Sequence, residues 1–525
     1  MDGRFFVFLG VERISTISYS RLQKGDNFAP SITALRKHMK RLALLVFLAS
    51  LITFAAAPSA HLGLNLSPCT VGSAKLPARC GTFIVYEDRA AATGRTVEIP
   101  LVVIPADHPS HRAIFWNPGG PGGAAVDAAD GIADRSFAKE LRALHGDYDI
   151  VLANNRGVGG PDAQQCDLSP PAHPEYYFLQ LWPDALLKAC RDRLAARANL
   201  SLYSSNISAD DLDDMRAALA YPKIVLDGDS YGTFFFFIYM RQHPEHVESA
   251  IFQGVAPPAL LKIPLEDAAG SQLAMDRVIA ACAQDAKCKS HFPQFKEHFA
   301  AVAHRFDAGP IKVRIENAAT KHPQDVLLSK EVFADRLRQA LYNAGPAAYV
   351  PYIIEHAYQG DYVPLGRLIE AVTQGFAHDV EFGLNLSVTC AEDIPFITED
   401  AVRRTSAGTF EGDARVRAQQ RACKIWNVRP VAASFDQPVR SSAPVLMISG
   451  TDDPATPPDF ATRELQYLPN GKQVLLQGAS HGDETDCTDD LLVKFVMAGG
   501  AQHLNTSSCT ASFHRPPFAT SMAGF

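Results

Sequence analysis

A serine between two glycines is the residue in this chain best placed to do chemistry. The stretch Gly228-Asp229-Ser230-Tyr231-Gly232 fits the pattern G-x-S-x-G, with the apolar run KIVL before it and TFFFFIYM after it. In this pattern the serine lies on a tight strand-to-helix turn, and the glycines avoid collisions with the neighbouring strand and helix. The alternative is an ordinary glycine-rich turn. Because an apolar strand precedes the motif and a helix follows it, we predict a nucleophilic serine.

A serine hydroxyl needs a base to become a nucleophile, and the base needs an acid to orient it. In this context the partners follow the serine in the order acid, then histidine, each after a later strand. Asp452 and Asp453 follow PVLMISG, and His481 follows KQVLLQGAS. The residues alone leave open which aspartate orients the histidine, the other being expected as a solvated loop acid. For His481, a surface-loop histidine is the alternative.

Attack on a carbonyl creates an oxyanion, which needs two preorganised N–H donors. One donor is expected from the amide of Tyr231, the residue after the nucleophile. The other should come from a loop after an earlier strand, and NPGGPGG (residues 117–123) follows the apolar run AIFW. Its glycines let the backbone approach a substrate closely, although a structural turn is the alternative.

The elements around these motifs indicate an α/β fold. Short apolar strands alternate with helices over residues 61–258, which predicts a mostly parallel sheet covered by helices on both faces. Residues 259–440 are rich in amphipathic helix instead, and far exceed the one or two βαβ units of ~30 residues needed to return to the sheet. We therefore predict an α/β-hydrolase-type core in residues 61–258 and 441–525, with an inserted helical lid in residues 259–440.

Composition excludes some classes of function. The 525 residues carry a net charge of −8 and no dense block of Lys and Arg, so nothing suggests nucleic-acid binding. The apolar fraction of 47% is sufficient for a large core.

The N-terminal region resembles an export signal. Residues 39–60 (MKRLALLVFLASLITFAAAPSA) have a basic head, an apolar run and small residues, which is the layout of a secretory signal peptide at about residues 39–57. Residues 1–38 resemble no domain, which would follow if the chain begins at Met39, so residues 1–60 are assigned as leader and signal peptide. We expect a secreted or periplasmic protein without stable membrane association after cleavage. The alternative is a retained anchor, but the run is shorter than the roughly 20 residues that span a bilayer.

Ten cysteines support export, because an even number can be fully bridged in an oxidising compartment. Sequence alone does not determine the connectivity, and buried free thiols are the alternative. The simplest pairing joins neighbours in sequence: 69–80, 166–190, 282–288, 390–423 and 487–509. There is no CxxC pair and no Cys/His cluster with zinc spacing, so no bound metal is expected.

Together these motifs resemble the proline iminopeptidase and tripeptidyl aminopeptidase branch of the α/β-hydrolases, S33-like serine peptidases. NPGGPGG is similar to the family's G-G-P-G loop, which places the second oxyanion donor at Gly120. NNRGVGGP is similar to D-x-R-G-x-G-x-S, with Asn154 and Pro161 in place of the usual Asp and Ser. GTDDPATPP is similar to G-x-x-D-P-x-T-P, which aligns Asp453 with the catalytic acid. GASHGDETDC is similar to G-x-G-H-G-x-x-x-x-C, with Ser480 for the second glycine.

The resemblance implies acyl transfer through Ser230, Asp453 and His481, with the amides of Tyr231 and Gly120 as oxyanion donors and no cofactor. It further implies an aminopeptidase that releases short N-terminal units from peptides with a free N-terminus.

Such an enzyme must bind the substrate's free amine, and a carboxylate in the lid could do so by pairing with its positive charge in a partly desolvated pocket. SVTCAEDIP offers Glu392 and Asp393, since family members carry a similar C-x-D/E stretch late in the lid. A solvated acid pair is the alternative. Two other functions stay open: a secreted esterase or lipase-like enzyme on the same triad, and a catalytically inactive binding protein.

Overall fold

The structure, a computed structural model, describes residues 61–524. The predicted leader and signal peptide, residues 1–60, therefore lie outside the described residues.

A nine-stranded sheet forms the centre of the fold, with strand order β1-β2-β3-β5-β4-β6-β7-β10-β11. Its strands are β1 (His61–Val71), β2 (Leu76–Tyr86), β3 (Thr96–Ile104), β4 (Ala113–Asn117), β5 (Asp149–Ala153), β6 (Ile224–Asp229), β7 (Val247–Gln253), β10 (Val445–Gly450) and β11 (Gly471–Leu476). From β5 to β11 every neighbouring pair is parallel, whereas β1, β2 and β3 join at one edge as antiparallel strands. The predicted mostly parallel sheet is confirmed, and β1 is a strand that sequence analysis did not predict.

Helices cover both faces of this sheet, and alternate strand residues point to the two layers. On one face, α6 (Ser205–Ala218), α7 (Tyr231–Gln242) and α18 (Asp459–Glu464) pack on a core that includes the phenylalanines of TFFFF. On the other face, α2 (Ala129–Ala133), α3 (Lys139–Leu144) and α19 (Asp486–Ala498) pack on a second core. The chain is thus an α/β-hydrolase fold, as predicted.

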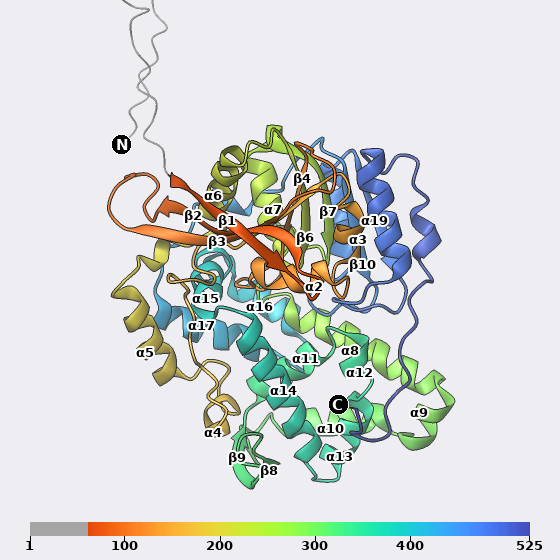
Figure 1. Cartoon of the computed structure of the whole chain (residues 1–525). Helices are drawn as coiled ribbons and strands as arrows, with labels where there is room; N and C mark the ends of the chain where they lie inside the picture. The colour runs from red at the N-terminus through yellow and green to blue at the C-terminus, as the bar shows by residue number, and fades with distance from the viewer. Residues whose placement is uncertain (1–60, 525) are drawn as a thin grey trace, which may run out of the picture. The chain divides into compact units, whose positions relative to one another are not determined.

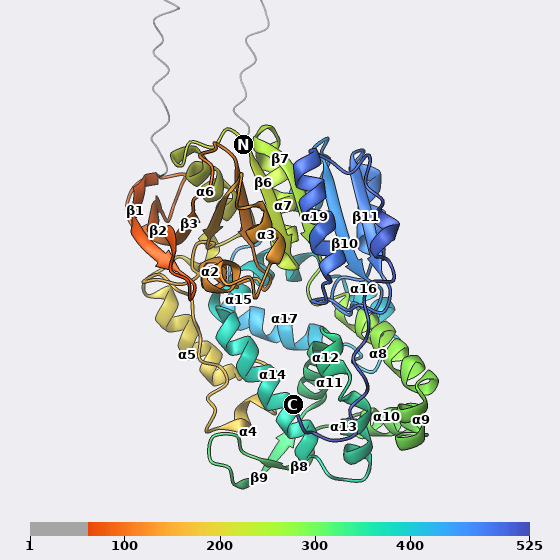
Figure 2. The ribbon, with the colours of Figure 1, turned by 45° about the vertical axis from the view of Figure 1, so that its right-hand side comes forward.

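Between β7 and β10, no described strand joins the nine-stranded sheet. This part of the chain is mostly helical, and its helices lie beyond one end of the sheet in both ribbon views (Figure 1 and Figure 2). Its helices are α8 (Asp267–Gln284), α9 (Ala286–His291), α10 (Phe295–His304), α11 (Lys330–Ala340), α12 (Ala344–Ala347), α13 (Val350–Tyr358), α14 (Val363–Asp379), α15 (Phe382–Glu392), α16 (Glu399–Ser406) and α17 (Ala414–Trp426). Two helices from earlier in the chain, α4 (Pro174–Tyr177) and α5 (Asp184–Ala195), pack into the same hydrophobic core.

An antiparallel hairpin interrupts these helices, formed by β8 (Ile311–Glu316) and β9 (Pro323–Leu328). Sequence analysis predicted a region rich in amphipathic helix and missed the hairpin. In β8, Val313 and Ile315 are buried and alternate with exposed Lys312 and Arg314, which is the period-two pattern of a half-buried strand.

All five predicted disulfides are present: Cys69–Cys80, Cys166–Cys190, Cys282–Cys288, Cys390–Cys423 and Cys487–Cys509. The described residues contain no free cysteine, so the free-thiol alternative is wrong. Each bridge joins cysteines that are near in sequence, so each one staples a local segment rather than linking distant parts of the fold.

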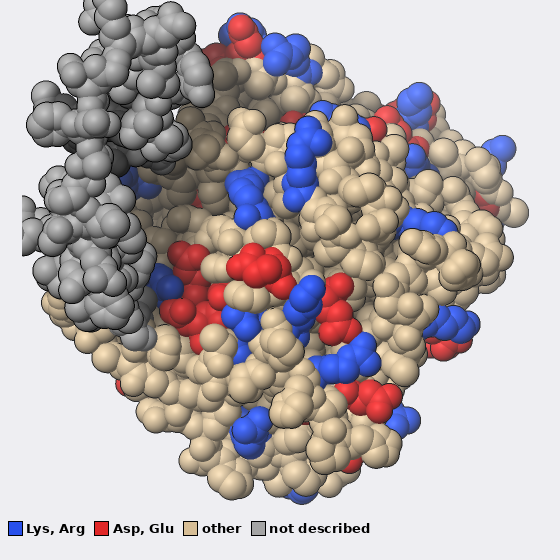
Figure 3. All heavy atoms as spheres, turned by 90° about the horizontal axis from the view of Figure 1, so that it is seen from above, with Lys and Arg blue, Asp and Glu red and all other residues tan. Residues whose placement is uncertain are grey.

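Two surface properties bear on partners. Within residues 61–524, no helix is both long and apolar enough to cross a membrane. On the face shown in Figure 3, the described residues carry acidic and basic side chains interspersed with uncharged ones. That face therefore lacks the continuous basic surface by which proteins attract nucleic acids.

Candidate active site

Ser230 lies on a sharp turn between β6 and α7. Its backbone angles are φ 56° and ψ −119°, a strained conformation for a residue with a side chain. The turn leaves no room for side chains on either side. A Cβ on Gly232 would lie 2.0 Å from the carbonyl oxygen of Asn117, and one on Gly228 would lie 2.8 Å from the carbonyl carbon of Gly232. The predicted strand–turn–helix arrangement is present. Glycine is needed on both sides of the serine because a side chain at either position would collide with the backbone.

His481 and Asp453 form a hydrogen-bonded pair at the ends of the next strands. Nδ1 of His481 lies 2.8 Å from Oδ2 of Asp453. The aspartate is almost fully buried and accepts three further bonds, from the amides of Ala455 and Thr456 and from the Thr456 hydroxyl. An acceptor held this firmly can fix the tautomer of the imidazole, with Nε2 free of the proton.

Electrostatics around the pair favour a charge-separated state. Burial would lower the pKa of His481, but the adjacent Asp453 outweighs it and raises that pKa above its usual value. Burial would likewise raise the pKa of Asp453, yet the His481 ring and the Thr456 donors lower it. The aspartate therefore stays ionised and stabilises a protonated imidazole.

The serine turn and the ring of His481 both lie against the end of β7. The amide of Ser230 donates to the carbonyl of Gln253 at 2.8 Å. The ring of His481 lies against the next residue, Gly254, where a Cβ would stand 2.7 Å from its Cε1. Among the described hydrogen bonds, those of His481 go to Asp453 and Thr456, and none goes to Ser230 Oγ. Such bonds are often long in unliganded sites and tighten when substrate is bound.

The glycine-rich loop 117–123 lies beside the serine. A Cβ on Gly119 would be 3.0 Å from Cβ of Ser230, so a side chain there would crowd the serine. Gly120, with φ 125°, lines the same cavity as Ser230 and Tyr231. The loop is held from its other side by the helical region, because Asn385 Nδ2 donates to the carbonyl of Pro121. The structure thus brings both predicted donor residues to the cavity that Ser230 faces.

The family-like segment NNRGVGGP plays a structural part. Arg156 is completely buried and donates two hydrogen bonds to Asp211 of α6, at 2.6 and 2.9 Å. It also donates to the carbonyl oxygens of Glu87 and Leu202. The guanidinium of Arg156 therefore links α6 to the segments that contain Glu87 and Leu202.

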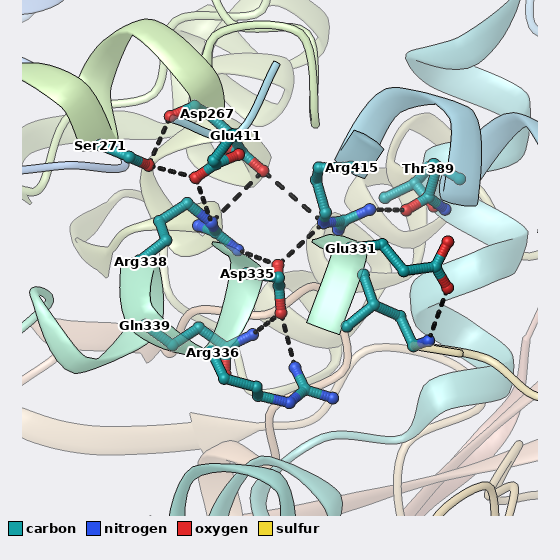
Figure 4. Close-up of polar contacts among 12 residues, drawn as sticks. Asp267, Ser271, Glu331, Asp335, Arg336, Arg338, Gln339, Thr389, Glu411 and Arg415 are labelled. Carbon is teal, nitrogen blue, oxygen red and sulfur yellow. Dashed lines mark hydrogen bonds and ion pairs between the residues drawn. The ribbon is translucent and has the colours of Figure 1, made fainter. Parts of the chain in front are cut away.

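The cavity at Ser230 has walls of two kinds. Apolar side chains form one part of the lining: Leu181, Trp182, Leu261, Ile263, Phe376 and Phe382. Charged side chains form another: Asp267, Asp335, Arg336, Arg338 and Arg415. Sequence analysis did not find this charged cluster, whose members come from three helices, α8, α11 and α17 (Figure 4). The spacing of Asp335, Arg336 and Arg338 on one helix was its only local signal.

Glu392 and Asp393 do not line this cavity. Glu392 accepts hydrogen bonds from the amide and hydroxyl of Ser205, at 2.5 and 2.7 Å, and that hydroxyl lies 2.7 Å from the hydroxyl of Tyr231. Burial raises the pKa of Glu392 to about 7 and that of Asp393 well above its usual value. Both are buried, so the alternative of a solvated acid pair is wrong.

Asp452 is not the solvated loop acid that sequence analysis expected. It pairs with Arg277 of α8 at 3.0 Å and with Arg515 of the C-terminal tail at 2.5 Å. The two neighbouring aspartates thus have different roles. Asp453 forms a hydrogen bond with His481, whereas Asp452 links the helical region and the C-terminal tail to the end of β10.

Comparisons with known proteins agree with this architecture. Residues 409–509, which contain Asp453 and His481, match the family model described as TAP-like protein. The serine protease Hip1 of Mycobacterium tuberculosis is 25% identical over 486 residues, which is 82% of this chain and 88% of that protein. The tripeptidyl aminopeptidase of Streptomyces coelicolor is 22% identical over 510 residues, covering 88% and 89%. Carboxylesterase B of Mycobacterium tuberculosis is 24% identical over 464 residues, covering 80% and 84%.

Two solved structures also align with the chain. The meta-cleavage product hydrolase CumD of Pseudomonas fluorescens aligns over 77% of this chain and 96% of its own, with 11% identity and a TM-score of 0.35. A serine hydrolase of Cycloclasticus zankles aligns over 83% and 95%, with 12% identity and a TM-score of 0.31. With its nine-stranded α/β-hydrolase fold, the chain is a serine hydrolase that is similar to the TAP-like proteins in the matched segment and to the curated relatives over most of its length.

Proposed function

We propose that the protein is a secreted serine peptidase, an aminopeptidase that releases short N-terminal units through an acyl-enzyme on Ser230. The observation that carries the proposal is that the strained serine turn and the ring of His481, which pairs with Asp453, both lie against the end of β7. A nucleophile, a base and an orienting acid at one rim of a sheet are what acyl transfer needs.

In the proposed reaction, Ser230 Oγ attacks the carbonyl carbon while Nε2 of His481 takes its proton. Asp453 accepts a hydrogen bond from Nδ1–H and stabilises the imidazolium. The amides of Tyr231 and Gly120 donate to the oxyanion. His481 then passes the proton to the leaving amine, and water activated by the same imidazole releases the acyl group.

Several observations support the finer parts of the proposal. The relatives named serine protease and tripeptidyl aminopeptidase favour peptide substrates. Five disulfides favour an oxidising compartment, hence export by the segment predicted at residues 39–57. We propose residues 259–440 as the lid, because α11, α14 and α15 within it line the cavity at Ser230.

The amine-binding role of Glu392 and Asp393 stays a prediction with a direct test. The substitution Glu392→Gln is assayed on matched free and N-acetylated peptides. Amine binding requires a larger loss on the free peptide. Equal losses on both would instead assign Glu392 to holding Tyr231 in place through Ser205.

The proposed function is tested by a profile over fluorogenic arylamides that carry one, two or three residues with a free N-terminus. We expect hydrolysis that favours one length, is lost in Ser230→Ala, and falls when the N-terminus is acetylated. Release of the fluorophore from acetylated and free peptides at equal rates would contradict an aminopeptidase.

An esterase is the second candidate, favoured by the similarity to carboxylesterase B. The same triad cleaves esters, so the leaving group decides between the two. Values of kcat/KM for arylamides and aryl esters with one common acyl group separate them. Measurable turnover of the ester with none of the amide would establish the esterase.

A further inference from the structure

The charged cluster in the cavity wall is built around one carboxylate. Asp335 accepts hydrogen bonds from Arg336 Nη1 (2.6 Å), Arg338 Nη2 (2.9 Å), Arg415 Nε (3.0 Å) and Gln339 Nε2 (2.8 Å). A carboxylate has about four lone-pair sites, so Asp335 is saturated. It therefore has no capacity left for a substrate group, while three guanidinium groups share its single charge (Figure 4).

In the part of the chain that the structure describes, the other two acids of the cluster, Asp267 and Glu411, form ion pairs only with Arg338 and Arg415. Asp267 lies 3.7 Å from Arg338 Nε and 3.8 Å from Arg415 Nε, and Glu411 lies 3.9 Å from Arg338 Nε. Within the described chain, neither acid forms an ion pair with Arg336. Of the described acids, Asp335 is thus the only one that pairs with Arg336, and it also pairs with Arg338 and Arg415. The positive charge of Arg336 is therefore the least neutralised of the three in the cavity wall.

One nitrogen of the Arg336 guanidinium, Nη2, has no hydrogen-bond partner among the described residues. Nε donates to the Thr373 hydroxyl at 2.8 Å and Nη1 to Asp335, but Nη2 makes no hydrogen bond within residues 61–524. Figure 4 shows that end of the guanidinium pointing away from Asp335. Arg336 is 5% exposed and lines the cavity that contains Ser230. The Nη2 donor is therefore free to bind a group that enters the cavity, and a carboxylate is the acceptor that suits a guanidinium best.

Protonation equilibria point the same way. Burial lowers the pKa of Arg336 below its usual value, and the nearby charges of Arg415 and Arg338 lower it further, whereas Asp335 opposes this lowering. Burial raises the pKa of Glu411 to about 8, so this acid is mostly neutral at pH 7. The wall therefore carries an excess of positive charge, which an anion would balance.

We infer that Arg336 binds a side-chain carboxylate in the acyl part of the substrate, so that the enzyme prefers released units that contain Asp or Glu. The inference rests on the proposed acyl transfer at Ser230. The acyl part is favoured over the leaving part because the leaving part of a long peptide must extend to solvent, whereas the acyl part ends within a few residues of Ser230.

The test compares kcat/KM for arylamides of Ala-Ala-Glu, Ala-Glu-Ala and Glu-Ala-Ala with their Gln counterparts. A charge-assisted hydrogen bond in a buried site should give about a tenfold or larger preference for Glu at one position. Arg336→Gln should reduce that ratio to about one while it retains activity on the Gln substrate. Arg336→Lys, which keeps the charge but loses the fork, should keep part of the preference.

Arg421→Gln is the matched control. Arg421 of α17 pairs with Glu331 of α11 at 2.9 Å, so it joins the same two helices but does not line the cavity. This variant should keep the wild-type Glu/Gln ratio. An equal loss of the ratio in both variants would mean that helix packing, not carboxylate binding, sets the preference, and would overturn the inference.

A binding measurement separates this inference from the proposed function. Calorimetry with Ser230→Ala compares the Glu and Gln arylamides without hydrolysis. Tighter binding of the Glu compound, lost in Ser230→Ala/Arg336→Gln, supports the inference even if the wild type cleaves no arylamide, in which case the proposed function alone fails. Equal binding of both compounds at every position overturns the inference even if the wild type cleaves them well.

Discussion

Gly254 offers a way to displace His481 without changing any reacting group. Gly254 follows β7 with φ 60°, and a Cβ there would lie 2.7 Å from Cε1 and 3.1 Å from Nδ1 of His481. Carbon atoms in contact stand about 3.5–4.0 Å apart, so Gly254→Ala must push the ring by about 1 Å. A shift of that size takes the 2.8 Å bond between His481 and Asp453 outside hydrogen-bonding range.

A catalytic group misplaced by about 1 Å costs on the order of 10²-fold in rate. Gly254→Ala also strains the backbone, since a left-handed residue with a side chain costs about 1–2 kcal/mol. Gly499→Ala is the matched control for that strain. Gly499 ends α19 with φ 68°, and a Cβ there would meet nothing within 4 Å.

The assay measures kcat on the best arylamide, corrected for folded enzyme by thermal melting and circular dichroism. We expect both variants to lose similar stability, and only Gly254→Ala to lose activity, by about 10²-fold. If Gly254→Ala keeps kcat within threefold of Gly499→Ala, the ring at this position is not the base, and the reasoning is refuted.

Three further predictions concern particular side chains. Asp453→Asn should lower kcat by about 10⁴-fold by presenting the wrong tautomer, whereas Asp452→Asn, which loses only ion pairs with the helical region and tail, should leave kcat within a few-fold; similar losses in both would contradict the division of roles. Burial raises the folded-state pKa of Glu140 to about 8, so its stabilising contribution is complete below its unfolded value of about 4.5 and is lost as pH rises through about 8. The Tm should therefore fall over this range, and an equally steep fall in Glu140→Gln would exclude Glu140 as a source. Replacing Cys487 and Cys509 with Ala removes a bridge between positions 22 residues apart, which should cost about 3 kcal/mol in urea unfolding; an unchanged midpoint would show that the bridge does not stabilise the fold.

Local signals were sufficient for the reactive turn. The glycines around Ser230 and the apolar runs beside it act within one strand–turn–helix unit, so their spacing predicts the geometry directly. The neighbour pairing of cysteines succeeded for a similar reason, because each bridge closes a short loop. The β8–β9 hairpin was missed because its alternating pattern is short and lies in a helix-rich region.

Long-range pairings could not be predicted from one sequence. Asp335 and Arg415 are far apart along the chain and meet only because α11 and α17 pack together. Asp452 looked solvated because its partners, Arg277 and Arg515, come from a helix and a tail that share no local motif with it. Charge clusters of this kind depend on tertiary packing, which composition and periodicity do not encode.

The central claim, that Ser230 is a nucleophile activated by His481, is tested most directly by labelling with a fluorophosphonate and mapping the modified peptide by mass spectrometry. We predict a single adduct on Ser230 in the wild type, no adduct in Ser230→Ala, and labelling slowed by at least a hundredfold in His481→Ala. An adduct on another residue, or equal labelling rates in the wild type and His481→Ala, would contradict the claim.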